Sequence, residues 1–164
     1  MGKYLTDIET DFILEAINIA KCKFIMDVGA EAGRFSLLAT KSKGSVIGID
    51  IDSYGLKRLK LKNKQVDVVL ADARKIPLHE KVLDATFMIE VIDYIPELEI
   101  ALSECYEALR PGGSLVLSFG NNSSLKSKLR RKSYQHSYGK VLQSLEETGF
   151  KIKRKMGYNW LPFN

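Results

Sequence analysis

Acidic side chains stand at or just after the ends of four apolar, strand-like runs of this sequence. They are Asp27, Asp50, Asp72 and Glu90. In an open α/β sheet, the carboxyl ends of parallel strands meet at one edge, and ligands bind there. A carboxylate at the second position can accept hydrogen bonds from two ribose hydroxyls, and one at the third from the exocyclic amine of adenine. The four positions predict a pocket for an adenosine that carries an amino acid.

A turn with two glycines follows the first of these runs. Residues 24–28 are apolar except for Asp27, and Gly29 and Gly33 then lead into a helical pattern. A buried strand that turns through glycines into a helix is how α/β sheets build nucleoside pockets. Together with Asp50, the turn predicts an enzyme that uses a cofactor.

The spacing of apolar residues predicts alternating strands and helices. Helical patterns cover about 6–21, with Thr6 and Asp7 available as caps, and 34–41, 54–62, 98–109 and 138–148. Strand patterns cover 23–28, 45–49, 66–70, 83–91, 114–119 and 150–156. This alternation predicts an α/β fold: a Rossmann-like, doubly wound, mostly parallel sheet of six or seven strands with helices on both faces.

Length and composition predict a single domain over residues 1–164, because a chain of this size can bury one core but not two. No apolar run approaches the roughly 20 residues of a membrane span, and acidic residues follow the N-terminus, so we expect a cytoplasmic protein. Cys22 and Cys105 have neither CxxC nor metal-ligand spacing. They are expected to be reduced structural thiols, and no metal site is predicted.

Basic charge is concentrated in the last quarter of the chain. Residues 1–120 hold 15 Lys and Arg against 18 Asp and Glu, whereas residues 121–164 hold 10 against 2. The densest part is 126–132. Such asymmetry indicates an anionic partner, which could be nucleic acid, a phosphorylated or carboxylated substrate or an anionic membrane, or else a solvated face.

Four segments resemble the class I S-adenosylmethionine-dependent methyltransferases, most closely the small-molecule group called type 11. Residues 27–34 are similar to the first family motif, D-x-G-x-G-x-G, and residues 48–52 to the second-strand motif. Residues 71–73 resemble the adenine-contacting turn, and residues 109–113 the L-x-P-G-G signature before the fifth strand. The resemblance covers roughly residues 10 to 155, and its strength lies in the order and spacing of the four motifs.

The resemblance implies S-adenosylmethionine as cofactor and assigns its contacts. The first strand and its turn would face the methionine end, the second strand the ribose, the third the adenine, and residues 90–92 the methyl-transfer face. The implied cofactor-binding residues are Asp27, Gly29, Ala30, Glu31, Gly33, Asp50, Ile51, Asp72, Ala73 and Glu90. Asp52 is expected to cap the next helix instead.

The implied reaction is in-line displacement of a sulfonium-bound methyl group, for which alignment and exclusion of water provide much of the acceleration. A dedicated catalytic residue can be absent. A hydroxyl or acidic-carbon acceptor would need a base, for which the candidates are His136, Tyr94, Asp93 and Glu90. A surface role for His136 in a basic loop is the alternative.

The chain departs from the family pattern at three places. Glu31 replaces the middle glycine, and its side chain would crowd the cofactor unless it points outward or meets the methionine ammonium group. Tyr94 stands where the family often has histidine. After the sixth strand pattern only residues 157–164 remain, so either the sheet has six strands or the chain is a piece that lacks a seventh.

Three other functions are weighed against methyl transfer to a small molecule. A nicotinamide-dependent oxidoreductase would need glycines in place of Glu31 and Arg34. A catalytically silent, methyltransferase-like binding module is compatible with the departures. An RNA-directed methyltransferase could use the basic residues 126–132, but the chain has no Asn/Asp-Pro-Pro-Tyr or Pro-Cys motif for base methylation. A small or anionic acceptor is therefore favoured over RNA.

Overall fold

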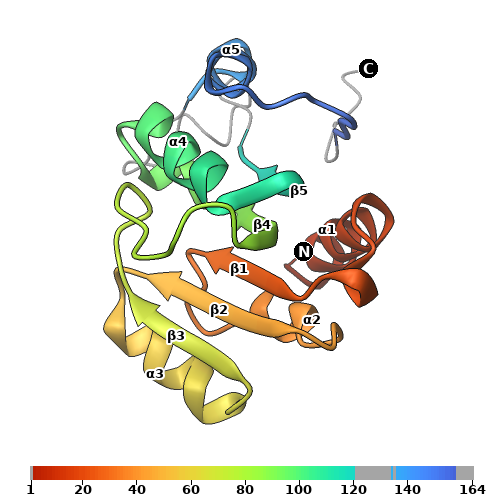
Figure 1. Ribbon diagram of the computed structural model, residues 1–164, viewed down its shortest axis with the longest axis vertical. Helices are drawn as coiled ribbons and strands as arrows, with labels where there is room; N and C mark the ends of the chain where they lie inside the picture. Colours follow the sequence, from red (N-terminus) through yellow and green to blue (C-terminus); the bar gives the residue numbers. More distant parts are fainter. Residues whose placement is uncertain (1, 121–133, 135, 158–164) are drawn as a thin grey trace.

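The computed structural model describes residues 2–120, 134 and 136–157 of the chain (Figure 1). Its centre is a sheet of five strands in the order β3-β2-β1-β4-β5, and every neighbouring pair is parallel. The strands are β1 (Phe24–Val28), β2 (Ser45–Asp50), β3 (Val66–Leu70), β4 (Leu83–Ile89) and β5 (Leu109–Ser118). The doubly wound parallel sheet confirms the predicted fold class.

Helices cover both faces of the sheet. In chain order they are α1 (Gly2–Ala16), η1 (Ile19–Lys21), α2 (Ser36–Ala39), α3 (Ser53–Lys62), η2 (Ile92–Tyr94), α4 (Leu98–Ala108) and α5 (Tyr138–Thr148). One buried core joins α1, α2 and α3 to the sheet through Ile13, Leu38 and Leu59. A second core contains Leu102 of α4 and Val141 of α5. The helices α4 and α5 lie side by side (Figure 1). β4 is buried along its whole length, because both cores cover it.

Local signals explain several helix ends. Asp52 caps α3 as predicted, since its Oδ1 accepts from Tyr54 N at 2.9 Å. α5 ends at Gly149, whose left-handed φ of 103° suits glycine. Cys22 and Cys105 are buried free thiols, as expected. Across the described residues, no helix has the length and apolar character needed to cross a membrane.

The predicted sixth strand at 150–156 is wrong, so the described part of the sheet has five strands rather than six or seven. The segment alternates apolar and basic residues, which is typical of a strand, but these side chains make contacts with helices instead of pairing with the sheet. Phe150 and Ile152 pack against the core of α4 and α5. Arg154 donates to Glu15 of α1 at 2.5 Å and lies over the ring of Phe12. These contacts anchor the segment without strand pairing.

Three element boundaries also differ from the predictions. The first helix begins at Gly2, before Thr6 and Asp7, and its last part is the separate turn η1. The helix expected at 34–41 shrinks to α2 because residues 31–35 remain in turns. β5 starts at Leu109 instead of residue 114, and a register shift between Leu83 and Ala85 accommodates the intervening Pro-Gly-Gly.

Candidate functional site

The loops that leave β1 and β4 meet where the strand order reverses, which is where open α/β sheets bind ligands. A Cβ on Gly29 would lie 2.3 Å from Val91 Cγ2, so a side chain there would force the two loops apart. Gly29 also has a φ of 70°. The structure thus requires glycine at this predicted site position for both reasons.

The rest of the β1 loop is fixed by backbone contacts. Gly29 N and Ala30 N both donate to Ile49 O of β2, at 2.8 and 3.0 Å. Gly33 has a φ of 87° and packs so closely on α3 that a Cβ would lie 2.2 Å from Leu59 Cδ1. The loop is therefore held against the end of β2 and the start of α3.

Asp50, at the end of β2, organises this part of the site. Its Oδ2 accepts from Glu31 N and its Oδ1 from Asp52 N, each at 2.8 Å. A carboxylate oxygen has two lone pairs, so each oxygen can accept one further hydrogen bond. The next residue, Ile51, is 75% exposed and adds apolar surface at this rim. This pairing of an oriented carboxylate with exposed apolar area suits a ribose and its base.

Glu31 adopts the backbone conformation of the glycine that it replaces. Its φ is 44°, in the left-handed region, and its side chain is exposed. A Cβ on Gly55 of α3 would lie 3.1 Å from Glu31 Cα, which indicates how closely the turn packs on that helix. An exposed side chain is compatible with both alternatives that the sequence left open, an outward orientation and a contact with the methionine ammonium group.

Asp72 follows β3 and accepts hydrogen bonds from Arg74, two residues further along the chain. Its Oδ1 accepts from Arg74 N at 2.9 Å and from Nε at 3.0 Å, and its Oδ2 from Nη2 at 2.6 Å. These bonds lower the pKa of Asp72 to about 2. Arg74 also contacts Glu97 at 2.5 Å. Half-buried Ala73 lies between the paired residues, and one lone pair on Asp72 Oδ2 remains for an adenine amine.

Glu90 follows β4 and belongs to an ion-pair cluster. Its Oε2 lies 2.8 Å from Arg34 Nη2, and the same nitrogen lies 3.3 Å from Glu9 Oε2 of α1. Glu90 N donates to both the carbonyl and the hydroxyl oxygen of Ser118, at 3.1 Å each. Glu90 has a φ of 58°. A non-glycine residue held in this conformation is a feature that recurs at functional sites.

Asp27 lies beneath the β1 loop rather than on the open rim. It is 3% exposed, and its Oδ2 accepts from Ser36 Oγ at 2.6 Å. Burial raises the pKa of Asp27 to about 6, although the bond from Ser36 opposes the shift. Its contact with the methionine end of a cofactor stays a prediction.

The candidate bases lie on or against the loop after β4. Asp93 Oδ2 accepts from Gly120 N at 3.0 Å, and Asp93 Oδ1 is buried without a hydrogen-bond partner among the described residues. Tyr94 is 64% exposed. His136 Nε2 lies 2.8 Å from Ile95 O, and since a carbonyl only accepts, Nε2 holds the proton and leaves Nδ1 as acceptor. The structure thus gathers the three candidates along one loop, and their roles stay predictions.

Charge at the rim fits S-adenosylmethionine. That molecule bears a sulfonium and an ammonium against one carboxylate, so an excess of protein carboxylates favours it. Basic side chains at this rim include Arg34, Arg74 and Lys62, whose Nζ donates to Ala32 O of the β1 loop at 3.1 Å. The acidic side chains are Glu9, Asp27, Glu31, Asp50, Asp72 and Glu90.

Sequence reasoning missed four residues of this arrangement: Glu9, Arg34, Arg74 and Ser118. Glu9 gave a signal that could have been used, because it stands four residues before Ile13 on the apolar stripe of α1 and is only 3% exposed. A carboxylate on a buried helix face needs partners. Arg74 gave a local signal as well, because it stands two residues after Asp72, which it holds. Arg34 and Ser118 gave none, since their contacts join segments far apart in the chain.

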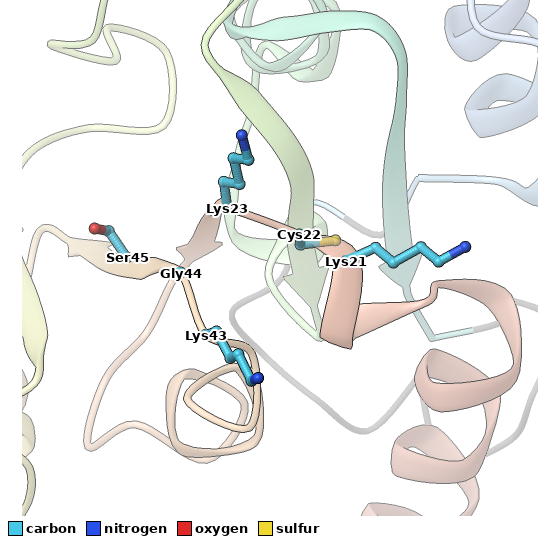
Figure 2. Close-up of a pocket in the computed structure, with 6 residues that line it drawn as sticks. All are labelled: Lys21, Cys22, Lys23, Lys43, Gly44 and Ser45. Carbon is cyan, nitrogen blue, oxygen red and sulfur yellow. The ribbon is translucent and has the colours of Figure 1, made fainter.

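A pocket lies at the opposite edge of the sheet, at the amino ends of β1 and β2 (Figure 2). In Figure 2 the side chains of Lys21, Lys23 and Lys43 point away from one another, so they do not converge on a ligand. Cys22 is buried, and desolvation raises the pKa of its thiol. This pocket therefore has no arranged chemistry, unlike the carboxyl rim.

Comparisons with known proteins point to methyltransferases. A family model described as "Methyltransferase domain" matches residues 26–117. The 24-methylenesterol C-methyltransferase 3 of Arabidopsis thaliana is 32% identical over 124 residues, which are 71% of this chain and 34% of that protein. The malonyl-[acyl-carrier protein] O-methyltransferase of Methylococcus capsulatus is 31% identical over 106 residues, 62% of this chain and 38% of that one.

A solved structure, the [4+2]-cyclase SpnF, superposes with a TM-score of 0.78 at 21% identity and covers 90% of this chain and 59% of its own. This likeness concerns the fold alone. The chain spans about a third of the length of the curated relatives that it matches.

Proposed function

This chain belongs to the class I S-adenosylmethionine-dependent methyltransferase family, and we propose that it transfers a methyl group from that cofactor to a small-molecule acceptor, with residues 1–164 acting as one domain. The observation that carries the proposal is Asp50. Two backbone amides orient its carboxylate at the topological switch point, and each oxygen retains a lone pair.

The residues around the crevice would bind and orient the two reactants. Asp50 would hold the ribose hydroxyls, Ile51 would cover the base, and Asp72 Oδ2 would accept from the adenine amine. When bound, S-adenosylmethionine supplies an electrophilic methyl carbon and a neutral thioether as leaving group. The loop after β4 would face the acceptor and keep water away from it.

Proton removal is required for acceptors whose nucleophile bears a proton, and also for an alkene acceptor, because the carbocation that methylation forms must lose a proton. His136 Nδ1 is the group that we propose for it. Asp93 Oδ1 is buried and would first have to become accessible to the acceptor. The hydrogen bond from His136 Nε2 to Ile95 O would fix the tautomer that presents Nδ1 as the base. A tertiary amine or a thioether, whose methylated product keeps its positive charge, would use neither group.

The acceptor class is narrowed only in part. One relative is named as a sterol C-methyltransferase and another as a malonyl-[acyl-carrier protein] O-methyltransferase. The two names therefore indicate different acceptors and do not choose one for this chain. An anionic acceptor would draw on the basic residues 126–132, which lie outside the described residues, as does any RNA contact through them.

Isothermal titration of the purified chain with S-adenosylmethionine and S-adenosylhomocysteine tests the proposal. We expect micromolar binding and a loss of about a hundredfold in Asp50→Ala, because two ribose hydroxyls lose a charged acceptor. Asp67→Ala is the matched control. Asp67 is an exposed residue of β3 that does not lie at the carboxyl rim, and its Oδ1 lies 3.4 Å from Lys60 Nζ. No binding by the folded wild-type chain would overturn the proposal.

A catalytically silent binding module is the second candidate function. Arg74 already fills most of the hydrogen-bonding capacity of Asp72, and Glu31 replaces a family glycine. The fold also occurs in a protein named as a cyclase. Failure to bind the cofactor would favour this candidate, whereas binding followed by release of S-adenosylhomocysteine with an acceptor would remove it.

A further inference from the structure

The outward face of α3 carries two large apolar side chains that no core uses. Tyr54 and Leu61 are 69% and 84% exposed. They stand seven residues apart, and two turns of an α-helix take about seven residues, so both lie on one line along the helix. The helix packs on the sheet through Gly55, Leu56 and Leu59, on its opposite side. The exposed line is therefore available to a partner.

Cations flank this apolar line on both sides. Lys57 precedes Leu61 by four residues and Lys64 follows it by three, which places both on one side of the line, whereas Arg58 lies on the other side. All three cations are exposed, and among the described residues none of them forms an ion pair with a carboxylate. We call Tyr54, Lys57, Arg58, Leu61 and Lys64 the basic face of α3.

Positive charge is concentrated at this side of the molecule. Residues 53–66 contain five Lys and Arg and no Asp or Glu. The helix α4, whose core lies against the other face of the sheet, contains three Glu and no Lys or Arg. Figure 1 shows α3 beside β3 at one edge of the sheet and α4 toward the other edge. The basic face therefore gives the described part of the molecule a side that attracts anions.

An anionic lipid bilayer matches both the charge and the apolar line. Acidic headgroups attract Lys and Arg that lie near the surface. Transfer of Leu61 from water to the acyl boundary is favourable, and the ring and hydroxyl of Tyr54 suit the headgroup level. Lysine stems can lie along apolar surface while their ammonium groups stay at the headgroups.

Two other occupants match the basic face less well. A nucleic acid would use the cations through its phosphates, but it would gain nothing from the apolar side chain of Leu61. A second copy that presented the same face would be repelled by like charge. The combination of cations with an exposed apolar line thus favours lipid.

We propose that the basic face of α3 docks this protein on an anionic lipid bilayer, with Leu61 at the boundary between headgroups and acyl chains. The helix has ten residues, so it would lie in the plane of the interface. Because α3 begins three residues after Asp50, the docked helix would hold the carboxyl rim close to the lipid. The inference goes beyond methyl transfer and does not depend on it.

Co-sedimentation with vesicles tests the proposal. Vesicles of phosphatidylcholine alone would be compared with vesicles of equal parts phosphatidylcholine and phosphatidylserine. We expect binding to the anionic vesicles only, and weaker binding at high salt. Lys57→Gln combined with Arg58→Gln should weaken this binding by about twentyfold, and Leu61→Ser by about tenfold. These side chains are exposed, so circular dichroism should show a folded chain in both variants.

Matched controls change the same residue types elsewhere on the surface. Lys153→Gln combined with Lys155→Gln removes two exposed cations outside α3. Ile100→Ser removes a half-exposed apolar side chain from α4. Both controls should bind anionic vesicles as the wild type does.

Three results would overturn the proposal. The first is wild-type protein that does not bind anionic vesicles, or that binds them equally well after the α3 substitutions. The second is binding to duplex RNA without binding to vesicles, which would assign the basic face to nucleic acid. The third is self-association, measured by sedimentation velocity, that Leu61→Ser abolishes, because a second copy would then cover this face.

Discussion

Asp50 and Asp84 are two carboxylates at opposite rims of the same sheet, and they differ in their hydrogen-bond partners and in their exposure to solvent. Asp84, at the amino rim, accepts from Lys23 N at 2.7 Å and Phe24 N at 2.8 Å, and its other oxygen pairs with Arg110. Its side chain is 3% exposed. Asp50 also accepts from two backbone amides, but with one amide on each oxygen and with partial exposure.

The difference shows what separates a structural carboxylate from a binding one. At Asp84 the protein supplies every partner and closes the site to solvent. At Asp50 the protein orients the group and leaves acceptor capacity at an open edge. Residue type and strand position alone therefore do not mark a site, whereas unused, oriented and accessible hydrogen-bonding capacity does.

The largest expected effect is on stability at the amino rim. Asp84→Ala would leave two backbone amides and the Arg110 charge without their acceptor, and we expect the free energy of unfolding to fall by about 3–5 kcal/mol. Urea denaturation followed by circular dichroism would measure it. Asp67→Ala, at an exposed pair, should cost less than about 1 kcal/mol. Equal losses of unfolding free energy in the two variants would contradict the structural role of Asp84.

Asp27 should make stability depend on pH in the direction opposite to that of a salt-bridged carboxylate. Burial raises its pKa from 3.8 to about 6, so between these values the folded protein holds a proton that the unfolded chain has released. Unfolding free energy should therefore fall, by about 2 kcal/mol, as pH rises from 4 to 6. Denaturation of wild type and Asp27→Asn across this window would measure it, and an identical slope in both would exclude Asp27 as the cause.

Left-handed residues occur at both rims and allow a paired test. Glu31 has a φ of 44° at the carboxyl rim, and Lys81 a φ of 57° just before β4 at the amino rim. Glycine at either position should raise stability by about 0.5–1 kcal/mol through relief of strain. Only Glu31→Gly should also change cofactor affinity. A change in affinity caused by Lys81→Gly would contradict the division between the rims.

The smallest expected effect is on the pKa of Asp72. Arg74→Ala should return the pKa of Asp72 from about 2 toward 3.8, because two side-chain hydrogen bonds and a charge are removed. The backbone bond from residue 74 remains, so the return should be incomplete. Carboxyl-detected NMR titration would follow it, with Arg154→Ala as a remote control. An unchanged pKa would contradict the contact between Arg74 and Asp72.

Local patterns were sufficient to predict the five observed strands and the positions of Asp50, Asp72 and Glu90 at one rim. Parallel strands bring their ends together without further information, so motif order along the chain becomes proximity in space. The capping role of Asp52 followed from a short-range rule and is confirmed.

Long-range contacts account for what the sequence did not predict. Residues 150–156 have a strand pattern, but the bonds of Arg154 to α1 decide their conformation. Glu9 reaches the rim through Ser118, a partner 109 residues away. The hydrogen bond between Asp27 and Ser36 was also not predicted, because it depends on how the turn between them folds back.

The most direct measurement is mapping of amide chemical shifts by ¹H–¹⁵N NMR during titration with S-adenosylmethionine. A cofactor site at the carboxyl rim predicts saturable shifts in residues 29–33, 50–52, 71–73 and 90–92, and unchanged amides around Lys21, Lys23 and Lys43 at the amino rim. Shifts centred on the amino rim, or none at saturating ligand, would contradict the assignment of the cofactor to the end of the sheet that Asp50 marks.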